Sequence, residues 1–431
     1  MQDKPIDLKS IGLLFGFLAS ILTIHLALDR TDSWLVPIYG VAFAFYIISY
    51  RKIKFEFKYL LILAVAIRLF LFLDLPNLSD DYFRFLWDGQ IWSNGINPYG
   101  YTPASIIDQL PLEFNALFQN LNSKEYHSTY PPISQFIFAI PSRFGIVDIF
   151  WSVNVIRAVL LLFDLGVIFL LYKLTADNSK VMLYALNPLV ILELVGNLHF
   201  EGTIIFFVVL AIVLFQQNRQ VKGAMSLAFA IMTKLTPLMF LPILIKKTGV
   251  KKSFMLYASI GSVMLLLLIP FLGKELFGLS EGLDLFFRKF EFNASVFFLV
   301  RMVGFWLKGY DVILDAGPWL TVIAFSLIMI YALAIVKNDT PWAEAFVVIL
   351  FIQLMFATTV HPWYTIPLIA FGILSGFNFP VLWSALVFLT YLGYNSSGYN
   401  HPMFWIFIEY LILIPYALYE LLILSSKRRH A

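Results

Sequence analysis

The sequence predicts an all-α polytopic membrane protein, with about 11–13 transmembrane helices and additional re-entrant or interfacial helices. First, 60% of the 431 residues are hydrophobic and only 13% are charged, whereas soluble domains average about 45–50% apolar and 25% charged residues. Second, 17% are aromatic, including 44 Phe, which is typical of lipid-facing surfaces and interfaces. Third, long apolar runs recur over the whole chain, so we treat residues 1–431 as a single transmembrane domain.

The composition also excludes several classes of site. The chain has no Cys, so disulfides, thiolate metal sites and Cys nucleophiles are excluded. A net charge of +3 is too small to indicate a nucleic-acid partner. The N-terminal MQDKPIDLK carries two acids and lacks a small-residue cleavage site, so we expect a retained first helix instead of a removed signal peptide.

The expected spans are apolar runs of roughly 17–25 residues, which are long enough to cross a bilayer. A shorter run at 364–377 is expected to be another span. The clear runs lie near residues 10–29, 34–50, 59–75, 151–174, 181–196, 203–217, 253–272, 318–336, 341–357, 380–394 and 403–424.

Lys and Arg in the short loops predict the orientation, because cytoplasmic connectors are enriched in both. The basic connectors, all expected inside, are RKIKFEFK (51–58), NRQVKG (218–223), KKTGVKK (246–252) and the terminal SKRRH (426–430). The polar connectors, expected outside, are 76–132, 197–202, 273–317, 358–364 and 395–402. We therefore expect a protein of the plasma (inner) membrane whose polar loops lie on the periplasmic or outer face.

Two segments do not fit a simple alternation of spans. Residues 224–245 are apolar, but both flanks are basic and the run contains Lys234 and Pro237. We interpret 224–245 as a re-entrant hairpin of half-helices, which is tolerated where protein buries the irregular backbone. A single span with one basic loop outside is the alternative. Residues 133–150 are expected to form a half-membrane hairpin or interfacial helices.

The first long external loop, 76–132, is too rich in aromatic residues to be a disordered linker, and loops of this length are usually functional when ordered. An acidic pair, Asp80 and Asp81, follows an apolar run. On a helix, Asp81, Arg84 and Asp88 share one face. A capped interfacial helix, with Asp80 as one candidate N-cap, could explain one acid. Two acids and an Arg beside the membrane favour a functional loop.

Further candidates lie on the same predicted side. Tyr130 precedes two prolines, which predict a rigid turn at a helix start and could shape a pocket. His199 and Glu201 could converge on an external turn, with a hydrated loop as the alternative; a divalent metal is only weakly indicated, because a spacing such as HExxH is missing. Lys234 lies far from either end of its apolar run and therefore needs an anionic partner, either a phosphate or a neighbouring acid.

The stretch HPWY supplies the last candidates. Trp363 and Tyr364 suit an interfacial aromatic belt, which leaves His361 unexplained; its imidazole could donate to a phosphate oxygen. Together the candidates have complementary chemistry, because carboxylates can accept a proton from a hydroxyl while Lys, Arg and His can hold an anionic leaving group. Transfer of a sugar from a polyprenyl phosphate needs both.

A series of motifs in chain order resembles the multi-spanning GT-C glycosyltransferases, and among them the bacterial alpha-mannosyltransferases that use polyprenyl phosphate sugars. These motifs are SDDYFRFLWDG, INPYGY, YPPISQ, LNPLVILE, NLHFEG, TKLTP and VHPWY. The resemblance implies a GT-C fold, a catalytic aspartate in the first large external loop and inversion at the anomeric carbon of a lipid-phosphate sugar donor. It also implies no nucleotide sugar, no cofactor and usually no obligatory metal.

Carried over to this chain, the catalytic aspartate is Asp81 or Asp80, and Asp81 is favoured because Asp81 to Phe85 resembles the Asp-x-x-x-Tyr pattern of the family. We therefore expect a hexosyltransferase that moves mannose from polyprenyl phosphate to a lipid or glycan acceptor. A transporter or flippase of lipid-linked glycans is the alternative, but it would need polar groups on both sides of the membrane. A ligase that uses diphosphate-linked glycans would need more external Arg. The residues expected to bind the sugar donor or its phosphate are Arg84, Asp88, Tyr130, His199, Glu201, Lys234, His361 and Tyr364.

Overall fold

The computed structural model describes residues 7–273, 278 and 290–424, and this part of the chain is almost entirely helical. The strands that it contains, β1 (Tyr394–Asn395) and β2 (Gly398–Tyr399), form a short antiparallel hairpin. The predicted all-α class is therefore confirmed. The first six residues, the terminal SKRRH and much of the beginning of the polar connector 273–317 lie outside the described residues.

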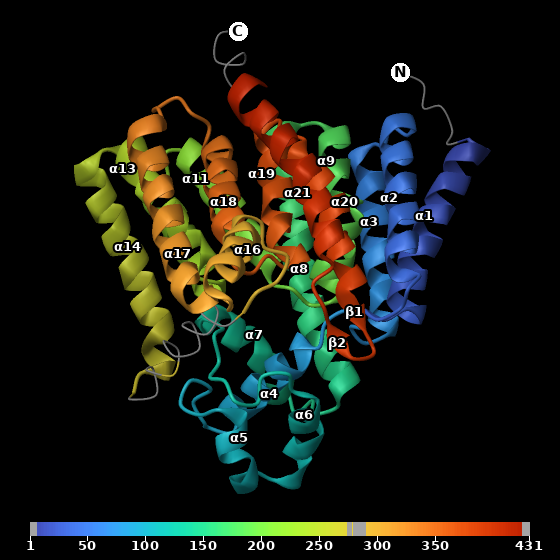
Figure 1. The fold of residues 1–431 in the computed structure, drawn as a ribbon, viewed down its shortest axis with the longest axis vertical. Coiled ribbons are helices and arrows are strands. Elements are labelled where there is room, and N and C mark those ends of the chain that lie inside the picture. The colour runs from blue at the N-terminus through green and yellow to red at the C-terminus, as the bar shows by residue number, and fades with distance from the viewer. Residues whose placement is uncertain (1–6, 274–277, 279–289, 425–431) are drawn as a thin grey trace. The chain divides into compact units, whose positions relative to one another are not determined.

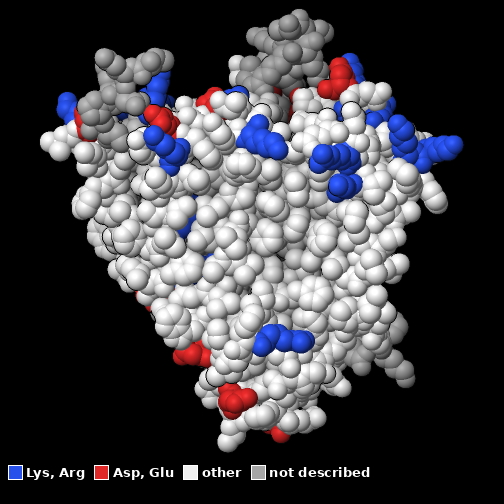
Figure 2. Space-filling view, turned by 180° about the vertical axis from the view of Figure 1, so that it is seen from behind, with Lys and Arg blue, Asp and Glu red and all other residues white. Residues whose placement is uncertain are grey.

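Five of the described helices are long and apolar enough to cross a membrane, and the chain is a multi-pass membrane protein. A further bent pair, Asn178–Ala185 with Pro188–Gly196 at 49°, would make a sixth span; Pro188 causes the break, because proline cannot continue a regular helix. The range of 11–13 spans stays a prediction. Most of the surface seen in Figure 2 belongs to uncharged residues, as lipid contact requires. The five helices are Leu8–Ala27, Ile149–Thr175, Val250–Phe271, Ile313–Ile335 and Met403–Leu422.

The contacts between residues divide the chain into two compact units. The first unit comprises Met1–Ser79, Leu161–His199 and Pro362–Ala431. The second unit comprises Asp80–Leu160 and Phe200–His361. Each unit is therefore assembled from segments that are distant in sequence, and each contains several of the apolar runs.

The first unit is a group of helices in which α1 (Leu8–Ala27) packs along α2 (Leu35–Lys52), as Figure 1 shows. Beside them, α3 (Phe57–Phe70) contacts α9 (Asn178–Ala185). The other elements are η1 (Leu71–Leu73), α10 (Pro188–Val190), the π-helix η4 (Ile191–Gly196), η9 (Pro362–Thr365), α19 (Ile366–Ser375), α20 (Phe379–Leu386), η10 (Val387–Gly393), α21 (Met403–Leu418) and η11 (Tyr419–Leu424).

A buried ionic cluster ties helices of the first unit together. Arg68, near the end of α3, forms a salt bridge with Asp164, on the part of α8 (Ile149–Thr175) that belongs to this unit. Tyr184 on α9 donates to Asp164 Oδ1 at 2.9 Å, and Arg68 Nη1 donates to the Ala185 carbonyl at 2.9 Å. The Arg68, Asp164 and Tyr184 side chains are fully buried. Each charge therefore has its counter-charge and hydrogen-bond partners inside the helix group.

From Asp80 onward, the long polar connector expected at 76–132 is a folded part of the second unit. It contains α4 (Asp81–Ser93) and leads into α7 (Pro132–Arg143). These helices pack closely because position 89 is glycine, where an added Cβ would lie 2.0 Å from the Phe138 carbonyl oxygen. Figure 1 shows α4, α5, α6 and α7 grouped together. The short elements of the connector are α5 (Pro103–Ile106), η2 (Ile107–Gln109), η3 (Leu112–Phe114) and α6 (Asn115–Asn120).

The rest of the second unit is built on the hairpin of α11 (Glu201–Gln216) and α12 (Gln220–Thr233). α12 also packs on α14 (Val250–Leu268), so it lies between two apolar helices. Such a position explains why the residues of α12 are mostly buried. The remaining elements are η6 (Ile269–Phe271), α16 (Val296–Lys308), α17 (Ile313–Ile330), η8 (Tyr331–Ile335) and α18 (Trp342–Phe356).

The segment expected to be a re-entrant hairpin, 224–245, is interrupted near its middle. α12 ends at Thr233, and Lys234 adopts an extended backbone. The chain then continues through η5 (Thr236–Phe240) and α13 (Pro242–Thr248). This break agrees with two half-helices, while their placement in the membrane stays a prediction.

Candidate active site

α4 carries the acidic residues that the sequence singles out. Asp81 is its first residue, and Asp80 holds the N-cap position without a capping hydrogen bond from its side chain. Both residues are partly buried, so neither is sealed from solvent. Asp81, Arg84 and Asp88 lie along one face of the helix, as predicted from their spacing of three and four.

Arg84 is directed into the protein instead of toward an open surface. Its Nε donates to Asp88 Oδ1 at 2.7 Å, and only 4% of its side chain is exposed. Its Nη1 donates to the backbone carbonyls of Ser123 at 3.1 Å and Tyr126 at 2.8 Å. Arg84 therefore joins α4 to a segment about 40 residues later in the chain.

Asp88 is completely buried and completes the same network. Besides Arg84, it accepts hydrogen bonds from the Ser128 hydroxyl and from Gln135 Nε2, the latter at 3.1 Å. Gln135 Nε2 also donates to the Tyr130 carbonyl at 3.3 Å. The predicted turn after Tyr130 is confirmed, because α7 begins at Pro132. These contacts support a role for Asp88 in holding the connector in place.

Asn122, in the same connector, forms a hydrogen bond with Asp81, the aspartate favoured as the base. Its side-chain Nδ2 donates to Asp81 Oδ1 at 3.2 Å. The sequence reasoning missed Asn122, since no local pattern links it to a residue 41 positions earlier. The contact leaves Asp81 partly exposed, as a group that must reach an acceptor hydroxyl requires.

Lys234 pairs with Glu201, the first residue of α11. Their Nζ and Oε1 atoms are 2.5 Å apart. Of the two partners expected for Lys234, a phosphate or a neighbouring acid, the structure shows the acid. The Glu201 side chain is 4% exposed whereas that of Lys234 is 32% exposed, so the ammonium group remains accessible to a ligand.

His361 belongs to the same unit and is influenced by Lys234. Burial, and then the positive charge of Lys234, lower the pKa of His361 from its ordinary value of 6.5 to about 3. The centres of the His361 and Phe292 rings are 4.4 Å apart. At neutral pH His361 is thus an uncharged imidazole, which can donate an N–H group without adding positive charge.

A second polar cluster lies in the first unit, around the π-helix η4. Glu193 is fully buried there and lies 3.3 Å from His199 Nε2. It also accepts from the Tyr391 hydroxyl at 2.9 Å and from Asn197 Nδ2 at 3.1 Å. The His199 ring stacks on the Trp363 ring at 3.6 Å. π-helical turns are frequent at functional sites, so Glu193, an acid in an apolar run, joins the candidates.

His199 and Glu201 were expected to converge on one turn, and the structure gives them different ion-pair partners. His199 pairs with Glu193, and Glu201 pairs with Lys234. Tyr364, in η9, packs edge-on against Trp363 at 5.9 Å. His199 and Tyr364 belong to the first unit, and the other predicted site residues belong to the second.

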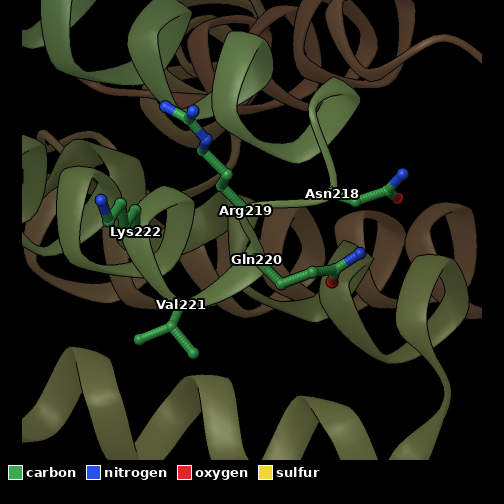
Figure 3. A pocket seen from close by; sticks show the side chains of 5 residues that line it. All are labelled: Asn218, Arg219, Gln220, Val221 and Lys222. Carbon is green, nitrogen blue, oxygen red and sulfur yellow. The ribbon is translucent and has the colours of Figure 1, made fainter.

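A pocket of about 400 Å³ lies at the turn between α11 and α12, and it holds none of the candidates. Figure 3 shows that all its lining side chains come from that one connector, Asn218 to Lys222. This connector carries Arg219 and Lys222, which placed it on the predicted cytoplasmic side. Across the described ranges, no three His, Asp or Glu side chains converge as metal ligands.

Comparison with known proteins adds one finding. A family model described as "Alpha-(1->6)-mannopyranosyltransferase, N-terminal domain" matches residues 34–248. No curated protein matches the chain, and no solved structure matches it. The matched range includes α4, Tyr130, His199, Glu201 and Lys234, whereas His361 and Tyr364 lie beyond its end.

Proposed function

Because the chain belongs, through residues 34–248, to the alpha-(1->6)-mannopyranosyltransferase family, we propose that it transfers mannose from a polyprenyl phosphate to a hydroxyl group of a lipid or glycan acceptor. The reaction takes place on the periplasmic or outer face of the plasma (inner) membrane. The observation that carries this proposal is Asp81, a partly buried carboxylate at the start of a helix in a multi-pass membrane protein. Apolar helices suit a donor with a lipid tail, and the carboxylate suits a hydroxyl acceptor.

In the proposed reaction Asp81 is the general base. Its carboxylate takes the proton of the acceptor hydroxyl as that oxygen bonds to the anomeric carbon. The bond between this carbon and the phosphate oxygen breaks, and its electron pair leaves with the polyprenyl phosphate. Attack from the side opposite the leaving group inverts the anomeric centre. An α-linked product, as the family description names, therefore requires a β-linked sugar donor.

The leaving phosphate is stabilised by Lys234 and His361. The Lys234 ammonium, partly exposed and oriented by Glu201, contributes positive charge, and the neutral His361 imidazole contributes an N–H group. Such groups act on charge that develops as the bond breaks. In this scheme no cofactor or metal is required. Arg84 and Asp88, whose contacts are internal, support the site instead of binding the phosphate.

We also propose that substrate is bound by Tyr130, in the second unit, and by His199 and Tyr364, in the first. His199 is held between Glu193 and the Trp363 ring, which fixes the plane of its imidazole. An imidazole and a tyrosine hydroxyl can both donate to sugar or phosphate oxygens. Tyr130 packs edge-on against Phe85 at 5.1 Å, so its ring orientation is set by α4.

The experiment compares Asp81→Asn, Asp80→Asn and Asp108→Asn in the purified protein. Asp108 is an exposed acid of the same connector and serves as the matched control. With polyprenyl phosphate mannose and a membrane lipid extract, product is followed by mass spectrometry. Asp81→Asn should lose about 10²–10⁴-fold in rate, and Asp108→Asn should match the wild type.

Two results would contradict the proposal. Transfer at the wild-type rate in both Asp81→Asn and Asp80→Asn would remove these aspartates from the mechanism. Product formed from a nucleotide-linked mannose, and not from polyprenyl phosphate mannose, would exclude the lipid-linked donor. Unchanged elution and melting of each variant in detergent establish that the loss of rate is not a loss of fold.

A further inference from the structure

The contact between Asn122 and Asp81 depends on a segment without regular secondary structure. α6 ends at Asn120, and no helix or strand follows until α7 begins at Pro132. Asn122 itself is exposed. A single hydrogen bond between partly exposed side chains is too weak to order such a segment. Something else must hold the backbone on either side of Asn122.

The Arg84–Asp88 pair supplies a large part of that hold, beside the hydrogen bonds from the Ala104 N–H to the Lys124 carbonyl and from Gln135 Nε2 to the Ser128 hydroxyl. Arg84 binds the carbonyl of Ser123, the residue directly after Asn122, and the carbonyl of Tyr126. Asp88 binds the hydroxyl of Ser128. The segment is therefore fixed at three points by charged side chains that are themselves almost completely buried, and hydrogen bonds to charged groups are the stronger kind.

The geometry forms a closed circuit on one helix face. α4 presents Asp81, Arg84 and Asp88 along one face. Arg84 and Asp88 hold the segment, and Asn122 of that segment donates to Asp81. An amide donor on Oδ1 fixes the rotation of the carboxylate about its Cβ–Cγ bond. The direction in which Asp81 presents its remaining lone pairs is then set by a partner 41 residues away.

We propose that Asn122 is a positioning residue for Asp81, and that the Arg84–Asp88 pair exists to hold Asn122 in place. The inference rests on the proposed function, in which Asp81 is the base. It adds a residue that orients the base, and it assigns the base to Asp81 over Asp80. Asn122 acts on the proton transfer and not on the binding of the sugar donor.

The test uses the full-length protein and three variants at position 122 or near it. Asn122→Ala removes the amide, Asn122→Ser keeps a shorter donor, and Asn120→Ala is the matched control, because the Asn120 amide donates only to the Ala116 carbonyl of its own helix. We expect kcat of Asn122→Ala to fall about ten- to a hundredfold with KM for the sugar donor unchanged. Asn122→Ser should recover part of the loss, and Asn120→Ala should lose nothing.

A pH profile separates positioning from a general loss of structure. The amide stabilises the ionised carboxylate, so its removal should move the acidic limb of the kcat profile to higher pH. Arg84→Met should lower kcat in the same way, and the double variant Asn122→Ala/Arg84→Met should lose no more than Arg84→Met alone, since both act through one contact.

The outcomes distinguish this inference from the function on which it rests. If Asp81→Asn is inactive while Asn122→Ala keeps the wild-type kcat and pH profile, Asn122 does not position the base and only the further inference fails. Equal losses in Asn122→Ala and Asn120→Ala, or fully multiplicative losses in the double variant, would also overturn it. If Asp81→Asn remains active, the assignment of the base fails first.

Discussion

Two buried Arg–Asp pairs in this chain have different surroundings. In the first unit, Arg68 and Asp164 are fully buried, and their further partners are the Tyr184 hydroxyl and the Ala185 carbonyl of α9 and the Ala64 carbonyl of α3. In the second unit, Arg84 and Asp88 are almost as well buried. Apart from Gln135 on α7, their further partners belong to the segment between α6 and α7, which also contacts the partly exposed Asp81 through Asn122.

The difference shows how to separate a stabilising ion pair from one that supports a site. Apart from the hydrogen bond from Arg68 Nη1 to the Ala64 carbonyl within α3, the contacts of the Arg68–Asp164 cluster lead from one helix to another. Arg84 donates to the carbonyl of Ser123, next to Asn122, and to that of Tyr126, and Asn122 in turn donates to Asp81. We therefore expect variants of the first pair to change mainly the stability of the protein, and variants around the second to change mainly its rate.

The largest effect should follow from breaking the first pair. Asp164→Asn leaves Arg68 charged and buried without its counter-charge, which we expect to lower the stability of the folded protein by about 3–5 kcal/mol. The double variant Arg68→Met/Asp164→Leu removes both charges and should recover much of that loss. Melting in detergent measures both. Equal melting temperatures for Asp164→Asn and the wild type would show that this pair does not stabilise the fold.

A smaller effect should come from His361, which burial and the nearby charge of Lys234 keep neutral. Its pKa is about 3 in the folded chain and 6.5 when exposed, so the unfolded chain binds more protons between these values. The stability that depends on neutral His361 is present above pH 6.5 and is lost as the pH falls toward 3. His361→Gln should flatten the decline of the melting temperature over this window. An unchanged decline would show that His361 is not the responsible group.

The smallest effect should come from removing metal ions. In the proposed reaction Lys234 and His361 handle the charge of the leaving phosphate, so treatment with EDTA followed by gel filtration should leave the transfer rate within about twofold of the untreated enzyme. Restoration of a lost rate by Mg²⁺ or Mn²⁺ would instead place a metal in the site. In that case a bound metal ion, and not only Lys234, would stabilise the charge of the leaving phosphate.

Local spacing predicted the face of α4 correctly but not the partners of its residues. The three-and-four spacing of Asp81, Arg84 and Asp88 requires only helical geometry, and the structure confirms it. That Arg84 binds the carbonyls of Ser123 and Tyr126 depends on the path of a connector with no periodicity, so no sequence pattern could indicate it. Interpreting Arg84 as a phosphate ligand followed from its charge alone.

For polar residues and prolines in apolar runs, the need of a charge for a partner and the effect of proline on a helix were more informative than residue spacing. Lys234 needed an anion, and the choice between a phosphate and an acid required the fold, which brings Glu201 from the start of α11. Pro188 interrupts an apolar run, and the π-helix that follows it carries a buried acid, Glu193. The shared turn expected for His199 and Glu201 failed to predict their partners, because the two residues belong to different units and each pairs within its own.

The pairing of Lys234 with Glu201 has a consequence for how a substrate arrives. Two opposite charges 2.5 Å apart form a dipole whose field fades within a short distance, so the pair cannot draw an anion from bulk water as an isolated cation would. A lipid-anchored phosphate does not need such attraction, since it reaches the protein by lateral diffusion within the bilayer. Turnover at low substrate should then follow the surface density of the donor in the membrane and respond little to ionic strength.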